Sequence, residues 1–283
     1  MVWSCLVSIL PGMAQTEKLT DYVNPFVGTD GYGNVYPGAQ IPFGGIQISP
    51  DTDSRFYDAA SGYKYNHLTL MGFSLTHLSG TGIPDLGDFL FIPGTGEMKL
   101  EPGTHEDPDQ GYRSRYSHDK EWASPNYYAV ELADYGVKAE MTSGVRSGMF
   151  RFTYPESDNA FIMIDMNHTL WQSCEWSNLR MINDSTITGY KLVKGWGPER
   201  HVYFTATFSK KLTGLRFVQD KKPVIYNTSR FRSSYEAWGK NLMACISFDT
   251  KAGEEVTVKT AISSVSTNGA KNNMAELAGL AFD

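Results

Sequence analysis

The sequence lacks most of the short motifs that indicate a particular catalytic, metal-binding or nucleotide-binding function. It has only three cysteines, Cys5, Cys174 and Cys245, and no C-x-x-C pair. Its six histidines show neither H-x3-H nor HExxH spacing, and its acidic runs lack EF-hand spacing, so we expect no metal site in this chain. The absence of GxSxG, Walker A and strand-GxGxxG-helix patterns argues against esterase, nucleotide-binding and dinucleotide-binding functions. Cys174 and Cys245 could pair in an oxidising compartment, but we expect two buried free thiols.

Basic clusters and long apolar runs are missing as well. The formal net charge is −6 over 283 residues, which argues against nucleic acid as a partner and favours a neutral one. The first residues contain an apolar run, Val2–Leu10, followed by small residues. The run is far shorter than the roughly 20 residues of a membrane-spanning helix. We therefore interpret residues 1–14 as the remnant of a signal peptide and expect an exported protein, periplasmic or associated with a bacterial cell surface, with no transmembrane segment.

A glycine-rich and proline-rich stretch, Gly28–Asp53, is the most distinctive part of the chain. Its composition predicts a shaped loop, because a helix or a plain strand would not tolerate so many left-handed and fixed-φ positions. Gly31 would let backbone N–H groups approach a ligand, Tyr32 and Tyr36 would stack on a sugar ring, and Asn34 would form directional hydrogen bonds. The alternative is a sandwich corner that binds nothing.

A second loop of the same character follows at Gly72–Pro93. His77, Asp85 and Asp88 lie there among glycines, so we predict that the two loops together form a ligand-binding rim. For the two aspartates we favour the alternative, in which they cap backbone N–H groups. Asp51 and Asp53 follow Pro50, where aspartate is ordinary turn chemistry.

Three tryptophans lie in segments without periodicity. Trp196, between Gly195 and Gly197, is either a stacking platform for a sugar or a plug at the end of the fold. For Trp171 and Trp176 we favour the plug.

The rest of the chain alternates with a period of two, which predicts strands separated by turn residues. Within His201–Phe208, the residues Val202, Phe204, Ala206 and Phe208 are expected to face a core. An all-β fold follows, a large antiparallel β-sandwich with a short helical segment at its C-terminal end. The other expected strands are Ile46–Ser49, ended by Pro50-Asp51, then Tyr128–Leu132, Val137–Met141, Gly148–Tyr154, Ala160–Met166, Ser185–Val193, Gly214–Val218, Pro223–Tyr226, Asn241–Phe248 and Glu255–Val265.

Two stretches depart from this period. Pro102–Asp119 is polar and charged and is expected to be an exposed connection. Ala270–Leu280 is expected to be helical, because Met274, Leu277 and Leu280 are spaced by three residues, with Asn268 as a possible cap.

The pair of motifs VNPFVGTDGYGNVYPGAQIPFGGIQISPDT and GYKYNHLTLMGFSLTHLSGTGIPDLGDFLFIP resembles the N-terminal domain of the glycoside hydrolase family 92 exo-α-mannosidases. The resemblance runs from about Asp21 to the end of the chain. It implies a galactose-mutarotase-like supersandwich over residues 15–266 and, at 267–283, the start of a helical linker to an (α/α)6 catalytic domain. It also implies a mannose-containing glycan as substrate. In this family the catalytic carboxylates and the ligands of a Ca2+ ion lie in that further domain, so no residue here is expected to be catalytic.

Two functions from different classes are compatible with these features. The chain is either the pocket-shaping part of an α-mannosidase, inactive without the catalytic domain, or a carbohydrate-binding or vestigial module acting alone. In the first case Gly31, Tyr32, Asn34, Tyr36, His77, Asp85, Asp88 and Trp196 are the candidates for substrate contact.

Overall fold

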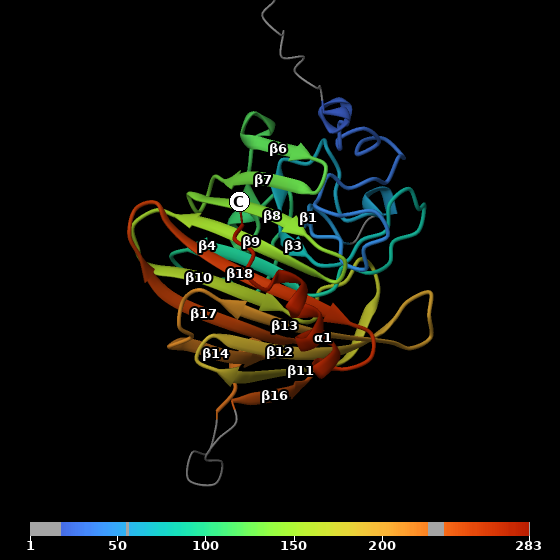
Figure 1. The fold of residues 1–283 in the computed structure, drawn as a ribbon. Helices are drawn as coiled ribbons and strands as arrows, with labels where there is room; N and C mark the ends of the chain where they lie inside the picture. The colour runs from blue at the N-terminus through green and yellow to red at the C-terminus, as the bar shows by residue number, and fades with distance from the viewer. Residues whose placement is uncertain (1–17, 55–56, 226–234, 283) are drawn as a thin grey trace, which may run out of the picture.

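The computed structural model describes residues 18–54, 57–225 and 235–282, which form two large antiparallel sheets packed face to face (Figure 1). The predicted β-sandwich is therefore confirmed. Residues 1–14, interpreted as a signal peptide, lie outside the described part of the chain. Strands of the seven-stranded sheet, in spatial order, are β1 (Ser49–Asp51), β3 (Gly72–Ser74), β4 (Leu90–Thr95), β10 (Ser157–Asp165), β17 (Leu242–Thr250), β14 (Gly214–Gln219) and β15 (Lys222–Pro223).

The second sheet has nine strands and is more regular. Its order is β16 (Glu236–Gly239), β11 (Ser173–Asn183), β12 (Thr186–Lys194), β13 (Arg200–Phe208), β18 (Glu254–Ser263), β9 (Ser147–Tyr154), β8 (Val137–Ser143), β7 (Tyr127–Leu132) and β6 (Glu121–Ser124). A small pair joins β2 (Thr69–Leu70) to β5 (Ser114–Arg115). The short 3-10 helices are η1 (Leu19–Tyr22), η2 (Tyr57–Ala59), η3 (Pro108–Gln110) and η4 (His118–Lys120).

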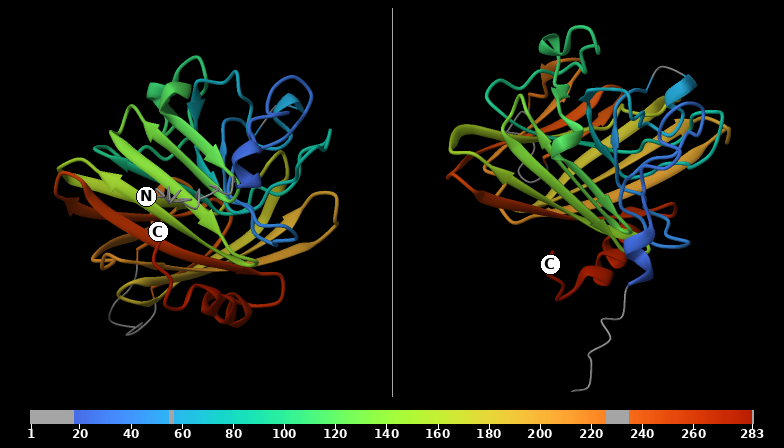
Figure 2. Two further views of the ribbon diagram at one scale, coloured as in Figure 1. Left: turned by 45° about the horizontal axis from the view of Figure 1, so that its top comes forward. Right: turned by 90° about the horizontal axis from the view of Figure 1, so that it is seen from above.

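The main core lies between the two sheets and follows the predicted alternation. Strand β13 turns Val202, Phe204, Ala206 and Phe208 into this core, as predicted. Helix α1 (Thr267–Asn273) packs on the opposite face of the nine-stranded sheet, against β18, β13 and β12 (Figure 2). Each sheet thus buries one complete apolar face against the other.

The seven-stranded sheet buries its second face too. In β10, Ile162 and Ile164 point into the main core, whereas Phe161 and Met163 belong to a separate apolar cluster on the outer face. Residues 97–113 contribute to the cover of that cluster, with Tyr112 buried. The prediction of an exposed connection over Pro102–Asp119 is therefore wrong in part, because aromatic side chains anchor this polar stretch to the sheet.

The prediction that Pro50 ends a strand is wrong. It lies inside β1, and the preceding residues from Ile46 to Ile48 form only an isolated bridge between Ala39 and Ile48. Proline is tolerated there because β1 is the edge of its sheet, where one side of the backbone needs no partner.

The C-terminal segment is helical, but differently from the prediction. Helix α1 is followed by the 3-10 helix η5 (Met274–Leu277), and Leu280 is exposed. Ser266 caps α1 by accepting a hydrogen bond from the Gly269 N–H at 3.0 Å, so the proposed cap at Asn268 is wrong.

Two smaller expectations are also settled. Cys174 and Cys245 are buried and unpaired, as predicted. The strand expected at Pro223–Tyr226 is the two-residue β15, and Tyr226 lies outside the described residues.

Candidate functional site

Four loop segments meet at one end of the sandwich, and we call them together the rim (Figure 1). The first segment precedes β1, the second joins β3 to β4, the third joins β10 to β11, and the fourth joins β12 to β13. In that order they are residues 28–36, 76–88, 167–172 and 195–199.

The second segment holds the others together. The Gly80 N–H donates to the Asn34 carbonyl of the first segment at 2.7 Å, and the Leu170 N–H of the third segment donates to the Leu86 carbonyl at 3.0 Å. The two glycine-rich loops predicted to form one rim are therefore neighbours in space.

The first segment closes on itself through its backbone. The Val35 N–H donates to the Gly28 carbonyl at 3.2 Å. A Cβ atom at position 33 would lie 2.2 Å from the Gly28 carbonyl oxygen, so this approach requires glycine at Gly33. Gly31 and Tyr32, at the tip of the loop, are exposed, and the Tyr32 side chain is 88% accessible.

Asp85 caps backbone N–H groups, as the alternative interpretation expected. Its carboxylate accepts from the Leu86 N–H at 2.6 Å and from the Trp196 N–H of the fourth segment at 3.1 Å. Asp85 thereby fixes the fourth segment against the second, and the Trp196 side chain remains 60% exposed.

Asp88 lies at the centre of a buried ionic cluster and has no exposed surface. Its carboxylate contacts the Lys191 ammonium at 3.1 Å and the Arg200 guanidinium at 2.5 Å, and it accepts from the Thr76 hydroxyl at 2.7 Å. Burial alone would raise the pKa of Asp88, but the two cations hold it well below its usual range. The ion pairs of Asp88 therefore connect β12 and β13 to the second segment.

A second buried cluster joins β1 to the second and third segments. The two Asp51 oxygens lie 2.8 Å from His77 Nε2 and 2.8 Å from His168 Nε2. His77 Nδ1 lies 2.9 Å from the Gln47 carbonyl, so both of its ring nitrogens face oxygen atoms. Burial would raise the pKa of Asp51, but the two histidines lower it well below its usual range. The interpretation of Asp51 as ordinary turn chemistry is therefore wrong.

The remaining predicted residues are buried within the first segment. Tyr36 packs its ring 5.0 Å from that of His77 and donates its hydroxyl proton to Gln40. Burial raises the pKa of Tyr36 well above its usual value. Asn34 is buried with a left-handed φ of 50°, which asparagine tolerates better than most residues.

The structure thus gathers all eight candidates in one region but divides them into two groups. Gly31, Tyr32 and Trp196 reach solvent, whereas Asn34, Tyr36, His77, Asp85 and Asp88 are buried. The buried group supports the loops, and the exposed group faces solvent.

Sequence reasoning missed two exposed aromatic residues at this end. Tyr57, in η2, is exposed, and a Cβ at Gly82 would lie 3.6 Å from its hydroxyl. Trp171 is 62% exposed, so its interpretation as a plug is wrong, as is that of the exposed Trp176. A signal for Tyr57 was present in the sequence, since it lies in a turn rich in small residues.

The acidic side chains that support the loops have internal partners. Asp51 of β1 and the buried rim carboxylates Asp85 and Asp88 form hydrogen bonds or ion pairs within the chain. Within residues 18–54, 57–225 and 235–282, no group of three or more His, Cys, Asp or Glu side chains is arranged to hold a metal ion. No helix in this part of the chain is long and apolar enough to cross a membrane.

Comparison with known proteins agrees with the motifs. The family model described as the glycosyl hydrolase family 92 N-terminal domain matches residues 22–263. The chain therefore belongs to glycosyl hydrolase family 92. This family 92 domain is 98% identical to a solved family GH92 alpha-mannosidase from Bacteroides thetaiotaomicron, with a TM-score of 0.92. The match covers 94% of this chain and 36% of that one, so the chain spans about a third of the solved enzyme.

Two more distant relatives complete the comparison. The structure of a family GH92 inverting mannosidase from Bacteroides thetaiotaomicron VPI-5482 is 24% identical with a TM-score of 0.76, over 94% of this chain and 34% of that one, and it supports the fold. A protein of Arthroderma benhamiae described as an uncharacterized secreted glycosidase is 30% identical over 139 residues, which is 48% of this chain and 17% of that protein.

Proposed function

We propose that the rim of this family 92 domain forms one wall of the pocket that binds the terminal mannose of a glycan in an exo-acting α-mannosidase. The other wall belongs to a further domain outside this chain, with which the domain acts. The observation that carries the proposal is the division of the rim, whose buried charges are paired internally while Tyr32 and Trp196 stay exposed. A solved enzyme 98% identical to the chain has been crystallised with mannoimidazole, which supports mannose as the sugar.

In this proposal the domain binds and orients the substrate. Flat aromatic faces suit the C–H faces of a pyranose, and the exposed backbone around Gly31 can approach its hydroxyl groups. Loops that are fixed by buried ion pairs lose little conformational freedom when the sugar binds, so they can hold the sugar in a productive position. The acid, the base and the Ca2+ ion belong to the further domain, and this chain alone does not hydrolyse mannosides.

The test is a loss of turnover in a complete enzyme that carries this domain. We expect Tyr32→Ala combined with Trp196→Ala to lower kcat/KM on α-mannobiose by at least about tenfold, equivalent to about 1.4 kcal/mol of binding in the transition state. Trp238→Ala is the matched control, because Trp238 is similarly exposed but lies on edge strand β16. An unchanged kcat/KM in the double variant would refute the proposal, and hydrolysis by the isolated chain would refute the assignment of catalysis to the further domain.

We also propose that the protein is exported, to the periplasm or the cell surface. The apolar run at Val2–Leu10 and the description of the Arthroderma relative as secreted support this location. Fractionation of cells expressing the complete enzyme tests it, with recovery in the cytoplasmic fraction as the contrary result.

A further inference from the structure

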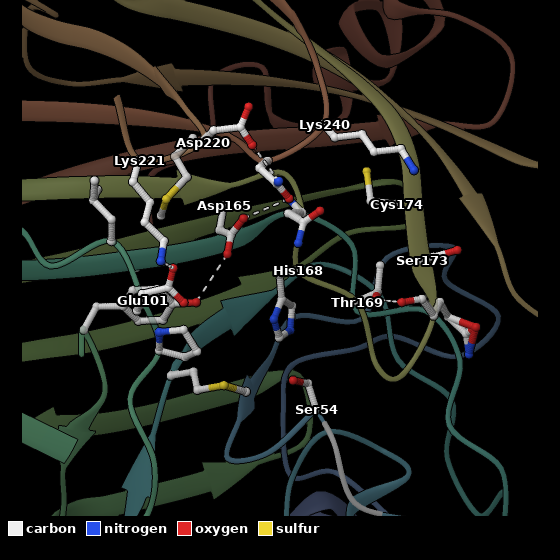
Figure 3. A pocket seen from close by; sticks show the side chains of 18 of the residues that line it. Ser54, Glu101, Asp165, His168, Thr169, Ser173, Cys174, Asp220, Lys221 and Lys240 are labelled. Atoms are coloured by element: carbon white, nitrogen blue, oxygen red, sulfur yellow. Dashed lines mark hydrogen bonds and ion pairs between the residues drawn. The ribbon is translucent and has the colours of Figure 1, made fainter. Parts of the chain in front are cut away.

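A cleft of about 990 Å³ lies beside the outer face of the seven-stranded sheet (Figure 3). It is enclosed by the covering segment around Glu101, the loop from Asp165 to Cys174, and the turns at Lys221 and Lys240. Figure 3 shows Asp165 and His168 projecting into it between Glu101 and Ser173. Its volume is at the upper end of the range of about 300 to 1,000 Å³ that is usual for small-molecule sites.

The third segment of the rim forms one wall of this cleft and separates it from the second segment. Gln172 donates its side-chain N–H to the Pro84 carbonyl at 2.5 Å on the rim side, while Trp171 and Thr169 line the cleft. The cleft and the exposed tip at Tyr32 are therefore different surfaces, and they can be tested separately.

Charged groups in the cleft already have partners: the lysines lie near carboxylates, and the aspartates accept hydrogen bonds from neutral groups. Lys221 lies 2.7 Å from Glu101, and Asp165 accepts from the Tyr112 hydroxyl at 3.3 Å and from the Asn167 N–H at 2.8 Å. In the same way Lys240 lies 3.3 Å from Glu175 and Asp220 accepts from Asn241 at 2.8 Å. A phosphate would have to displace a carboxylate from Lys221 or Lys240, whereas hydroxyl groups can join the existing hydrogen bonds, since each carboxylate oxygen accepts more than one.

Trp171 is held in an unfavourable conformation at this cleft. Its φ is +67°, in the left-handed region where a side chain with a Cβ is disfavoured, and its indole is exposed. The loop keeps it there through the Trp171 N–H, which donates to the Thr169 carbonyl at 3.2 Å, and through the Thr169 hydroxyl, which donates to the Gln172 carbonyl at 2.8 Å. An exposed tryptophan in a disfavoured backbone conformation serves neither the core nor the loop, which points to a ligand.

We propose that this cleft is a second saccharide-binding site, which takes a neutral oligosaccharide with one pyranose ring stacked on Trp171. Carboxylate groups that line the cleft, among them Glu101 and Asp165, bind the hydroxyl groups. The chemical class rests on the cleft alone, and the expectation that the sugar is mannose rests on the proposed function. The site would hold a part of the glycan remote from the bond being cleaved, or a neighbouring chain of the same polymer.

The experiment is a titration of the 283-residue chain with α-mannotriose, followed by tryptophan fluorescence and calorimetry, with circular dichroism to establish folding. We expect a Kd near the millimolar range and a weakening of at least about tenfold in Trp171→Gly. Glycine accepts a φ of +67° without penalty, so this variant should melt at the same or a higher temperature while losing the sugar. Trp122→Ala, an exposed tryptophan on β6, should bind like the wild type.

Three results would overturn the inference. They are no binding of α-mannotriose at about 20 mM by the folded chain, equal binding by Trp171→Gly, and tighter binding of mannose 6-phosphate than of mannose. Loss of binding in Tyr32→Ala but not in Trp171→Gly would assign the sugar to the rim, which overturns this inference while supporting the proposed function. An unchanged kcat/KM in the Tyr32→Ala, Trp196→Ala double variant would refute the proposed function but would not affect the titration result.

Discussion

The first and second rim segments have similar glycine-rich sequences and opposite constructions. The first closes mainly through its backbone, around Gly28 and Gly33, with no ion pair of its own acidic residue among the described contacts, and leaves Tyr32 exposed. The second directs Asp85 and Asp88 inward and is fixed by their partners on β12, β13 and the fourth segment. Glycine-rich composition therefore indicates that a loop is shaped, but the placement of charge decides which side chains remain available to a ligand.

The largest effect is expected from the second segment. Asp88→Asn leaves Lys191 and Arg200 buried or half-buried without their counter-charge, so we expect it to lower the free energy of unfolding by about 3–5 kcal/mol. Urea denaturation measures this change. Asp109→Asn is the control, because it breaks an exposed ion pair with Arg115 and should leave the free energy of unfolding almost unchanged. Similar losses in the two variants would contradict the stabilising role of the buried Asp88 cluster.

Low pH should reveal the same dependence on buried carboxylates. The folded-state pKa values of Asp51 and Asp88 lie below the unfolded value of about 3.9. Their contribution is therefore complete above that value and is lost as the pH falls through the folded-state values. We expect the melting temperature to drop as the pH is lowered from about 4 to about 2, and Asp51→Asn to show a shallower dependence. An equal slope in that variant would contradict the stabilising role of the Asp51 cluster.

The first segment should respond to backbone crowding. Gly33→Ala places a Cβ against the Gly28 carbonyl, and we expect a loss of more than about 1 kcal/mol in the free energy of unfolding. Gly197→Ala, where a Cβ meets no atom within 4 Å and φ is not left-handed, should be nearly neutral. Thermal unfolding of the two variants compares them, and a neutral Gly33→Ala would show that the loop does not need its tight closure.

The smallest effect on stability is expected at the exposed tip. Tyr32→Ala should change the free energy of unfolding by no more than about 0.5 kcal/mol, since its side chain is largely in water. Calorimetric melting of the isolated chain tests this. A large destabilisation would mean that Tyr32 supports the first segment, which would weaken its assignment to sugar contact.

The sequence allowed the fold to be predicted where period-two alternation was intact. Strand β13 is a clear case, with its four core residues identified correctly. Strand β11 was missed because its register shifts between Cys174 and Trp176 and again between Met181 and Asn183, and such bulges break the alternation.

The site was predictable as a region but not in its details. The two loops were correctly placed together, yet His77 and Asp88 could not be recognised as buried. Asp88 pairs with Lys191 and Arg200, which come from strands about 100 or more residues further along the chain, and His77 shares the carboxylate of Asp51 with the distant His168. Only the folded arrangement of the two sheets shows which charges are neutralised and which aromatic rings remain free.

Proline in the outermost strands has a consequence for how this domain behaves in concentrated solution. Both margins of the seven-stranded sheet contain one, Pro50 in β1 and Pro223 in β15, and β15 also carries Lys222. A proline has no N–H to offer an incoming strand, and a lysine disfavours an apolar neighbour. The sheet therefore resists growing by addition of another molecule at either side, which guards the domain against fibrillar self-association.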